Sequence, residues 1–461
     1  MTETGERGAN EFDVIVVGLG PGGEHVALKL GEAGWRVLGV EERLVGGECP
    51  YFGCVPSKMM IAAAETLRQA GRVDGMAGSA TVAPDWGPVA ARIRDEATDD
   101  WDDTVAVKRL EDAGGTFVRG RGVLAGDGRV VVGDTTYTAT RGIVINTGTT
   151  PAAPPIPGLA DTPFWTNRDV VRLTDLPASL AVIGGGAIGC ELAQVMATFG
   201  VRVSVVEVAD RLVALEEPEA SAALEQAFAE SGIQVLTGAS IASVSYEDGK
   251  FTLDLGDQKL DADKLLVAAG RRNNLQGLGL EHVGVDPDVK VLETDERMRV
   301  TDGVWAVGDI VGKGAFTHVS MYQAGVVLDD LLDRERPWAD YRAVSRVTFT
   351  APEVASVGLT EKAARDSGVD VVSATTGDLG TRGWITREPG LIKLVADRSR
   401  EVLVGGVVVG PAGGEIMSML ELAVHAEVPI RTLLHQHFAY PTYQRSYETV
   451  LKDLGSQLGG R

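Results

Sequence analysis

The feature that most constrains the fold of this chain is an internal duplication. Two segments follow the same order: an apolar strand, a glycine-rich turn, a helix of small residues, and a second strand that ends in a glutamate. The first strands are expected at 13–17 and 180–183, and in each segment the glutamate lies 23 positions after the first glycine of the turn. Units of this kind build a parallel sheet with helices packed on it. The chain is therefore predicted to contain two α/β domains with the same plan.

Both turns have the spacing GxGxxG, which is typical of Rossmann-like dinucleotide-binding domains. Because glycine has no Cβ, the backbone can approach a pyrophosphate closely, and the N–H groups at the start of the following helix can bind it. The glutamate at the end of the second strand is suited to bind ribose hydroxyls. The residues concerned are Gly18, Gly20, Gly23 and Glu41 in the first segment, and Gly184, Gly186, Gly189 and Glu207 in the second.

Glu207 also bears on the choice of nicotinamide nucleotide. A carboxylate at this position would repel a 2′-phosphate and pair with a free 2′-hydroxyl, which favours NADH over NADPH. Arg202 and Arg211 are close to Glu207 in sequence and weaken this preference for NADH.

Two of the three cysteines, Cys49 and Cys54, directly follow the first of these units. On a regular helix, residues five apart differ by about 7.5 Å along the axis and by about 140° around it, which is beyond the reach of a disulfide. The backbone is therefore expected to be distorted here, as Pro50 and Gly53 permit. A zinc site would need about four ligands, and no further cysteine or histidine cluster accompanies the pair. The pattern predicts a redox-active pair and no metal.

The composition limits the compartment and the partners. The formal charge of −22, from 43 basic and 65 acidic residues, would repel nucleic acids and anionic membranes. The N-terminal segment MTETGER is polar and acidic and does not resemble a secretory signal, and no run reaches the roughly 18 apolar residues that a membrane span needs. We therefore expect a cytoplasmic protein with no nucleic-acid or membrane partner.

The cysteine segment carries a family resemblance. Residues 46–58, GGECPYFGCVPSK, resemble the GGTCxxxGCxPSK signature of the flavoprotein disulfide reductases, the class I pyridine nucleotide-disulfide oxidoreductases, with a pattern closest to lipoamide dehydrogenase. Residues 301–309 resemble the second FAD motif of the family, and residues 349–361 resemble its dimerisation domain. The resemblance implies an FAD-dependent oxidoreductase that carries electrons from NADH to a small-molecule acceptor. Its fold class would be α/β, with two Rossmann-like domains for FAD and NAD and a C-terminal α+β dimerisation domain that forms a homodimer.

The resemblance also implies roles for single residues. Cys54 would be the thiolate beside the flavin, and Cys49 the thiol that exchanges with the substrate. Lys58 and Glu191 would form an ion pair near the flavin. The other positions expected at the cofactors are Gly47, Gly148, Gly270, Arg271, Gly308, Asp309 and His318.

The expected domains follow from these motifs. They are the first part of the FAD-binding domain at 1–150, the NAD-binding domain at 151–270, the central part of the FAD-binding domain at 271–338, and the dimerisation domain at 339–461. Within them, the Asp-Gly pairs at 127–128 and 248–249 predict hairpins. Residues 90–113, which contain neither proline nor glycine, predict a helix.

One stretch departs from the family pattern. The family has a His-Pro-x-x-x-Glu motif near the C-terminus, which supplies a base from the partner subunit, but here Tyr440 and Arg445 occupy the histidine and glutamate positions. Tyrosine, with a usual pKa of about 10, is a poor base at neutral pH, and His437 is the nearest substitute. Three alternatives stay open: a disulfide reductase with an atypical substrate, a quinone, dye or metal-ion reductase that uses the same flavin, and a redox sensor without turnover.

Overall fold

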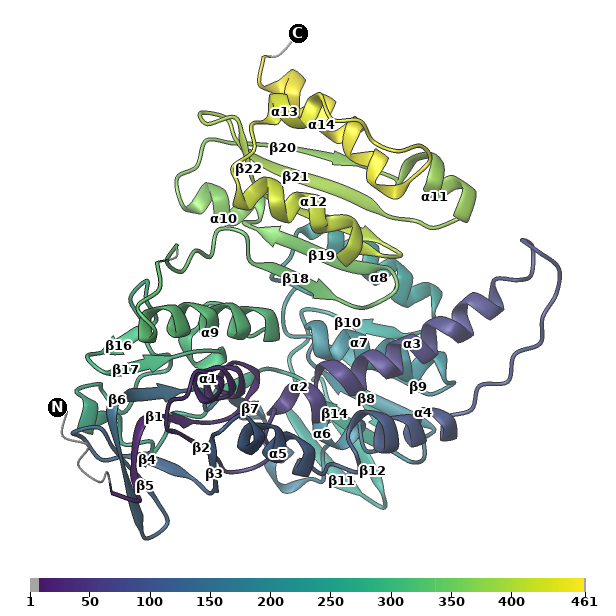
Figure 1. The fold of residues 1–461 in the computed structure, drawn as a ribbon. Helices are drawn as coiled ribbons and strands as arrows, with labels where there is room; N and C mark the ends of the chain where they lie inside the picture. Colours follow the sequence, from purple (N-terminus) through teal and green to yellow (C-terminus); the bar gives the residue numbers. More distant parts are fainter. Residues whose placement is uncertain (1–7, 336, 460–461) are drawn as a thin grey trace. The chain divides into compact units, whose positions relative to one another are not determined.

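The structure is a computed structural model that describes residues 8–335 and 337–459 (Figure 1). Contacts between Cα atoms divide the chain into two compact units, each assembled from separate stretches of sequence. Unit 1 consists of Met1–Pro56, Arg92–Pro151 and Arg271–Asp340, and unit 2 of Ser57–Ala91, Ala152–Gly270 and Tyr341–Arg461. Unit 2 thus joins the second and fourth segments expected from the sequence, and the limits of the four expected segments stay a prediction.

The central sheet of unit 1 is built around a buried apolar strand. β1 (Glu11–Val17) pairs in parallel with β2 (Val37–Glu41) on one side and with β6 (Thr135–Ile145) on the other. Every residue of β1 after the first is buried, as expected for a strand that is covered on both faces. The strand order is β16-β17-β6-β1-β2-β3, with β3 at Thr116–Arg119, β16 at Arg299–Thr301 and β17 at Val304–Ala306.

Two helices of unit 1 pack closely together beside this sheet (Figure 1). α1 (Pro21–Glu32) begins with proline at its first position, where the missing N–H costs nothing. It packs on α9 (Thr317–Leu331), and a Cβ at Gly22 would lie only 2.8 Å from the backbone oxygen of Ser320. Glycine at position 22 is therefore required by the close approach of the two helices.

The region from 87 to 112 is not one helix, so the helix predicted at 90–113 is wrong in its continuity. α4 (Gly87–Arg92) runs into a π-helical turn (Ile93–Ala97), and α5 (Thr104–Asp112) begins only after a loop. The hydroxyl of Thr98 donates a 3.0 Å hydrogen bond to the backbone oxygen of Ile93, and such a bond competes with the helical pattern. The next three residues then adopt left-handed φ angles of 47°, 54° and 59°.

Unit 2 contains the second parallel sheet, in the order β10-β9-β8-β14. The strands are β8 (Ser179–Ile183), β9 (Arg202–Val206), β10 (Gln234–Leu236) and β14 (Lys264–Val267), and α7 (Ala187–Thr198) follows β8. An antiparallel sheet of β11 (Ser243–Glu247), β12 (Lys250–Asp254) and β13 (Lys259–Ala262) precedes β14 in the chain. The hairpin predicted at 248–249 is formed by β11 and β12. The one at 127–128 joins β4 (Gly122–Leu124) to β5 (Arg129–Val132) in unit 1.

The C-terminal part of unit 2 is an antiparallel sheet in the order β18-β19-β22-β21-β20. Its strands are β18 (Ser345–Thr348), β19 (Glu353–Gly358), β20 (Val371–Thr376), β21 (Leu391–Asp397) and β22 (Val402–Gly410). α12 (Gly413–His425) and α14 (Ser446–Gln457) cover the sheet (Figure 1). Their apolar residues, including Leu420 and Tyr447, form one core with the strands. The predicted fold class, α/β with a C-terminal α+β part, is confirmed.

Within the part of the chain that the structure describes, no helix is both long enough and apolar enough to cross a lipid bilayer.

Candidate active site

The two cysteines lie on either side of a break in the helical backbone. α2 (Glu48–Tyr51) is a single turn that carries Cys49, and α3 (Cys54–Gly71) begins at the second cysteine. A Cβ at Gly47, which has a φ angle of 69°, would lie 2.9 Å from the Cα of Gly20 in the first glycine-rich turn. The distortion predicted between the cysteines is confirmed, and glycine at 47 lets this segment pass against the first dinucleotide loop.

The chemistry of the two thiols differs. Both are free thiols in the structure. Hydrogen bonding with Cys54 and burial raise the pKa of the Cys49 thiol, while the hydroxyl of Thr317 acts in the opposite direction. The same hydroxyl lies 3.3 Å from the sulfur of Cys54. The Cys49 thiol therefore releases its proton less readily than an isolated thiol does.

The sequence analysis selected His318 at the start of α9, but the neighbouring residue contacts the thiols. His318 is exposed and its ring stacks on Phe316, with the ring centroids 5.3 Å apart. Thr317 is the first residue of α9, and its hydroxyl reaches both cysteines. A hydroxyl residue at the start of this helix was the only sequence signal that could have indicated it.

Lys58 and Glu191, both in unit 2, form the predicted ion pair. The Lys58 Nζ atom lies 2.8 Å from Oε2 of Glu191, whose side chain is only 7% exposed. The other carboxylate oxygen accepts a 2.8 Å hydrogen bond from the backbone N–H of Phe349, and the Lys58 ammonium lies 4.5 Å from the centre of the Phe349 ring. The pair is thus held in place by protein contacts, whereas its position beside a flavin stays a prediction.

The first glycine-rich turn is fixed by Asn146 at the end of β6. Its side-chain oxygen accepts a 2.9 Å hydrogen bond from the N–H of Gly23, and its amide donates a 2.8 Å bond to the oxygen of Val307. A Cβ at Gly18 would collide with the backbone of Asn146, and a Cβ at Gly20 would lie 2.9 Å from its side-chain oxygen. The three predicted glycines are therefore needed for the shape of the turn that opens α1.

The residues around this turn fit FAD. Glu41 accepts 2.8 Å hydrogen bonds from the N–H groups of Leu19 and Arg43, and burial raises the pKa of its carboxyl group. Next to the turn, the buried hydroxyl of Thr147 has no partner in the structure, and space is open beside the Cα of Gly148, whose φ angle is +62°. A bound polar ligand would form a hydrogen bond with the Thr147 hydroxyl and occupy the space beside Gly148.

Asp309 and Arg271 both reach the side chain of Thr149. The threonine hydroxyl donates a 2.6 Å hydrogen bond to Asp309, and the Arg271 Nε atom lies 2.6 Å from the same hydroxyl. Arg271 also pairs with Glu48 at 3.4 Å, next to Cys49. Gly308 has a φ angle of 85°, and its N–H donates a 2.6 Å bond to Gln323. The structure thus brings Asp309 and Arg271 together at the start of β7 (Thr149–Pro151), which follows β6 in the chain.

The second glycine-rich turn, in unit 2, repeats the first. A Cβ at Gly184 would meet the backbone of Ala268, and one at Gly189 would meet Gly184, whereas space is open at Gly186. Gly270, with a φ angle of +133°, also faces open space. Glu207 accepts a hydrogen bond from the N–H of Gly185 and a 2.7 Å bond from that of Ala209, as Glu41 does in the first unit. The arrangement fits a second dinucleotide.

The arginines near Glu207 are directed elsewhere. Arg211 donates hydrogen bonds to the backbone oxygens of Ala214 and Glu216, at 2.7 Å and 3.2 Å. Arg202 is the first residue of β9, so it lies at the opposite end of that strand from Glu207. The third cysteine, Cys190, is fully buried in α7, and burial raises the pKa of its thiol.

At the C-terminal stretch, the residues that replace the family's histidine and glutamate contact each other. Tyr440 is 66% exposed, and the guanidinium of Arg445 lies 5.2 Å from the centre of its ring. Arg445 also pairs with Glu448 at 3.0 Å. His435 and His437 are exposed. This stretch therefore presents a phenol and an arginine where the family pattern has an imidazole and a carboxylate.

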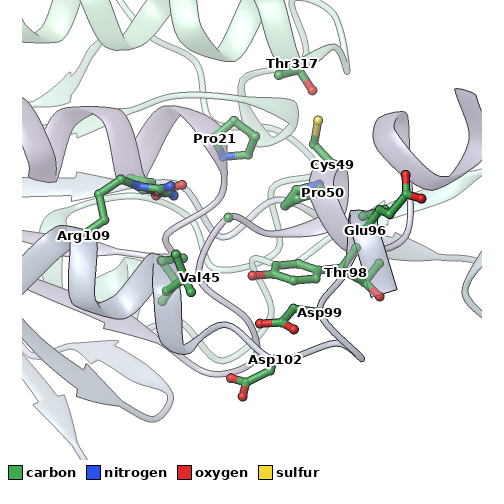
Figure 2. A pocket seen from close by; sticks show the side chains of 16 residues that line it. Pro21, Val45, Cys49, Pro50, Glu96, Thr98, Asp99, Asp102, Arg109 and Thr317 are labelled. Atoms are coloured by element: carbon green, nitrogen blue, oxygen red, sulfur yellow. Dashed lines mark hydrogen bonds and ion pairs between the residues drawn. The ribbon is translucent and has the colours of Figure 1, made fainter. Parts of the chain in front are cut away.

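A cavity of about 420 Å³ opens beside Cys49 in unit 1 (Figure 2). The thiol points towards Thr317, and Asp99 and Asp102 lie on the opposite side of the cavity in this view. Four acidic residues and one arginine are among its lining residues: Glu24, Glu96, Asp99, Asp102 and Arg109. These carboxylates were not among the residues predicted from the sequence, although the run DDWDD at 99–103 is an acidic signal. Among the described residues, no group of three or more His, Cys, Asp and Glu side chains is placed to hold a metal ion.

Comparison with known proteins gives a consistent result. Residues 12–324 match the pyridine nucleotide-disulphide oxidoreductase family, and residues 344–451 match its dimerisation domain. A dihydrolipoyl dehydrogenase of Chlamydia muridarum is 32% identical over 94% of this chain and 94% of its own. A mercuric reductase of Staphylococcus aureus is 31% identical over 94% of this chain and 80% of its own. A Cu(II) complex of the flavoprotein disulfide reductase RclA of Escherichia coli superposes with a TM-score of 0.84 at 25% identity, over 96% of this chain and 100% of that one.

Proposed function

The chain belongs to the pyridine nucleotide-disulphide oxidoreductase family, and on that premise we propose that it uses NADH to reduce a small disulfide through Cys49 and Cys54. It is an FAD-dependent and NAD(P)H-dependent oxidoreductase. FAD supplies the transfer of two electrons from the nicotinamide to the sulfur of Cys54. The thiol exchange that follows is carried out by residues of the chain.

The observation that carries the proposal is that Cys49 and Thr317 both line the cavity, with the Thr317 hydroxyl shared between both cysteines. The sulfur of Cys49 attacks one sulfur of the substrate, whose S–S bond breaks. The first substrate thiol leaves with the proton of Cys49. The Cys54 thiolate then attacks Cys49, and the second substrate thiol leaves and takes a proton from solvent. The sum is NADH, a proton and a disulfide converted into NAD⁺ and two thiols.

We assign the cofactors to the two glycine-rich turns. FAD is held in unit 1 by the first turn, Glu41, Thr147 and Asp309, and the nicotinamide nucleotide by the second turn and Glu207. Lys58 and Glu191 are assigned the place beside the flavin that the family pattern gives them, which their burial and mutual contact support.

NADH is proposed as the preferred nicotinamide nucleotide. Glu207 presents a carboxylate at the end of β9, and the Arg211 guanidinium is bonded to backbone oxygens. Neither Arg202 nor Arg211 is therefore assigned to a 2′-phosphate, so the nucleotide with a free 2′-hydroxyl, NADH, is favoured. We further propose that the enzyme works as a homodimer, which the match to the dimerisation domain supports, and in the cytoplasm, where NADH is available and a dithiol can remain reduced.

Turnover with a neutral disulfide tests the proposal. The holoenzyme should oxidise one NADH for every two thiols released from bis-hydroxyethyl disulfide. Cys49→Ser should lose at least about a hundredfold in this rate, because the exchanging sulfur is gone. A Cys49→Ser enzyme that reduces the disulfide as fast as the native protein would overturn the thiol step.

A second candidate function is the reduction of a quinone or a metal ion at the same flavin. It is favoured by Tyr440 and Arg445, because neither residue supplies the thiol-activating base and a quinone needs none. One relative is named mercuric reductase, and one similar structure is a Cu(II) complex. NADH-dependent quinone turnover that persists in Cys49→Ser would support this candidate, whereas its complete loss would count against it.

A further inference from the structure

The cavity beside Cys49 is a site defined by the redox-active thiol and by its volume of about 420 Å³. Every lining residue belongs to unit 1. A substrate must bring its disulfide to the Cys49 sulfur, so its other groups must lie among the lining residues.

The charges on the lining do not cancel. Arg109 is bonded to Glu24, with Nε 3.1 Å from Oε1, and Glu96 is bonded to Arg92 at 3.1 Å. Asp99 and Asp102 are both exposed, and neither forms an ion pair with another residue in the described ranges. Asp99 and Asp102 are therefore two carboxylates of the lining that have no paired cation among the described residues.

Asp102 is held in its ionised form. Its carboxylate accepts hydrogen bonds from the Thr104 hydroxyl at 2.5 Å and from the Thr104 N–H at 2.8 Å, and these bonds lower its pKa. The bonds also orient the carboxylate at the start of α5. Asp102 therefore remains charged throughout the neutral range.

Tyr51 lines the same cavity. Burial raises the pKa of Tyr51 to about 12, and Asp103 and Glu24 add to the rise, more than Arg109 offsets. The backbone oxygen of Tyr51 accepts a 3.0 Å hydrogen bond from the Trp101 ring. This bond ties the loop at residues 98–103, here called the acidic loop, to α2, which carries Cys49.

From these contacts we propose that the cavity selects disulfides that carry positive charge and disfavours disulfides that carry carboxylates. The inference rests on the proposed function, because it concerns the substrate of the same thiol exchange. The bonds made and broken are those of that exchange: Cys49 attacks the cationic disulfide, and the two thiols leave with one proton each. The carboxylates act through their field and not by coordination, since the described residues form no metal-binding cluster.

Three small disulfides of similar size separate charge from chemistry: cystamine is a dication, bis-hydroxyethyl disulfide is neutral, and dithiodipropionate is a dianion. We expect kcat/KM of the holoenzyme with NADH to fall in that order at low ionic strength, with at least about a tenfold span between the ends. The span should shrink as salt is added, because salt screens exposed charges.

Variants of the lining test the residues directly. Asp99→Asn should reduce the ratio of cystamine to dithiodipropionate turnover about threefold, by slowing the first and speeding the second. A folding defect would instead slow both. The matched control is Asp134→Asn, an exposed carboxylate in the turn between β5 and β6, which should leave the ratio unchanged.

Two results would overturn the inference in distinguishable ways. If the three disulfides are reduced without the expected order, or if Asp99→Asn leaves the ratio unchanged, charge selection is wrong while the disulfide reductase function stands. If the holoenzyme reduces a quinone but none of the three disulfides, the proposed function is wrong and the inference falls with it.

Discussion

The side chain of Thr317 contacts both Cys49 and Cys54. Its hydroxyl lies 3.3 Å from Cys54 and acts to lower the pKa of Cys49, against the effects of Cys54 and of burial. The shared hydroxyl therefore makes Cys49 easier to ionise than its surroundings alone would allow.

Replacing this hydroxyl gives a residue-scale prediction. In Thr317→Val, the pKa of Cys49 should rise, because a hydrogen bond to the thiolate is lost. A bond worth about 1 kcal/mol corresponds to roughly a fivefold slower alkylation of the NADH-reduced enzyme by iodoacetamide at neutral pH. Thr317→Ser keeps the hydroxyl and should react at the native rate. Equal rates for valine and serine would show that the hydroxyl does not act on the thiols.

At the scale of elements, Lys393 on β21 joins two helices to the C-terminal sheet of unit 2. Its side chain is 6% exposed and lies 3.0 Å from Glu217, 2.9 Å from Glu219 on α8 (Pro218–Glu230), and 3.0 Å from Glu361 on α10 (Glu361–Asp366). A buried ammonium is tolerated only when carboxylates surround it. Removing the ammonium would leave three carboxylates facing one another.

This cluster predicts a pH dependence of stability. Hydrogen bonding with Arg365, together with Lys393 and Ser373, lowers the pKa of Glu361 from its usual 4.5 to about 2. A lowered folded-state pKa stabilises the protein above the unfolded pKa, and this stability is lost as pH falls towards the folded value. The contribution of Glu361 should be about 2 kcal/mol at pH 6 and should disappear between about pH 5 and pH 2.

Urea unfolding at several pH values checks this contribution. Glu361→Gln should be less stable than the native protein at pH 6 and nearly equal to it at pH 2. The control is Lys362→Gln, because Lys362 is 83% exposed and pairs with Asp366 on its own helix. A constant difference between Glu361→Gln and the native protein at all pH values would contradict the account.

Most of the helices and strands could be predicted from the sequence, whereas the conformation of the acidic loop could not. Local signals sufficed for the two glycine-rich turns, because a strand, a glycine spacing and a helix follow one another in the chain. The break after α4 combines the local hydrogen bond of the Thr98 hydroxyl with a tertiary one, from the Trp101 ring to Tyr51, fifty positions earlier. The left-handed φ angles of Asp99, Asp100 and Trp101 carry no sequence signal such as glycine. For this reason the cavity beside Cys49 could not be predicted from the sequence pattern.

At the scale of the whole molecule, the duplicated units explain why the chain needs two cofactors. Each unit presents a glycine-rich turn and a glutamate that accepts backbone hydrogen bonds, in the same order. The cysteine pair follows only the first of these turns. The net charge of −22 has the same sign as the cavity lining, so approach of an anionic acceptor is disfavoured before it reaches the site.

The central claim is that electrons reach the acceptor through Cys54 and Cys49. The most direct measurement is anaerobic reduction of the holoenzyme by one equivalent of NADH, followed by absorbance spectroscopy. We predict a long-wavelength band from the Cys54 thiolate beside the oxidised flavin, which Cys54→Ser should lose and Cys190→Ala should keep. Absence of the band in the native enzyme, or its persistence in Cys54→Ser, would contradict the claim.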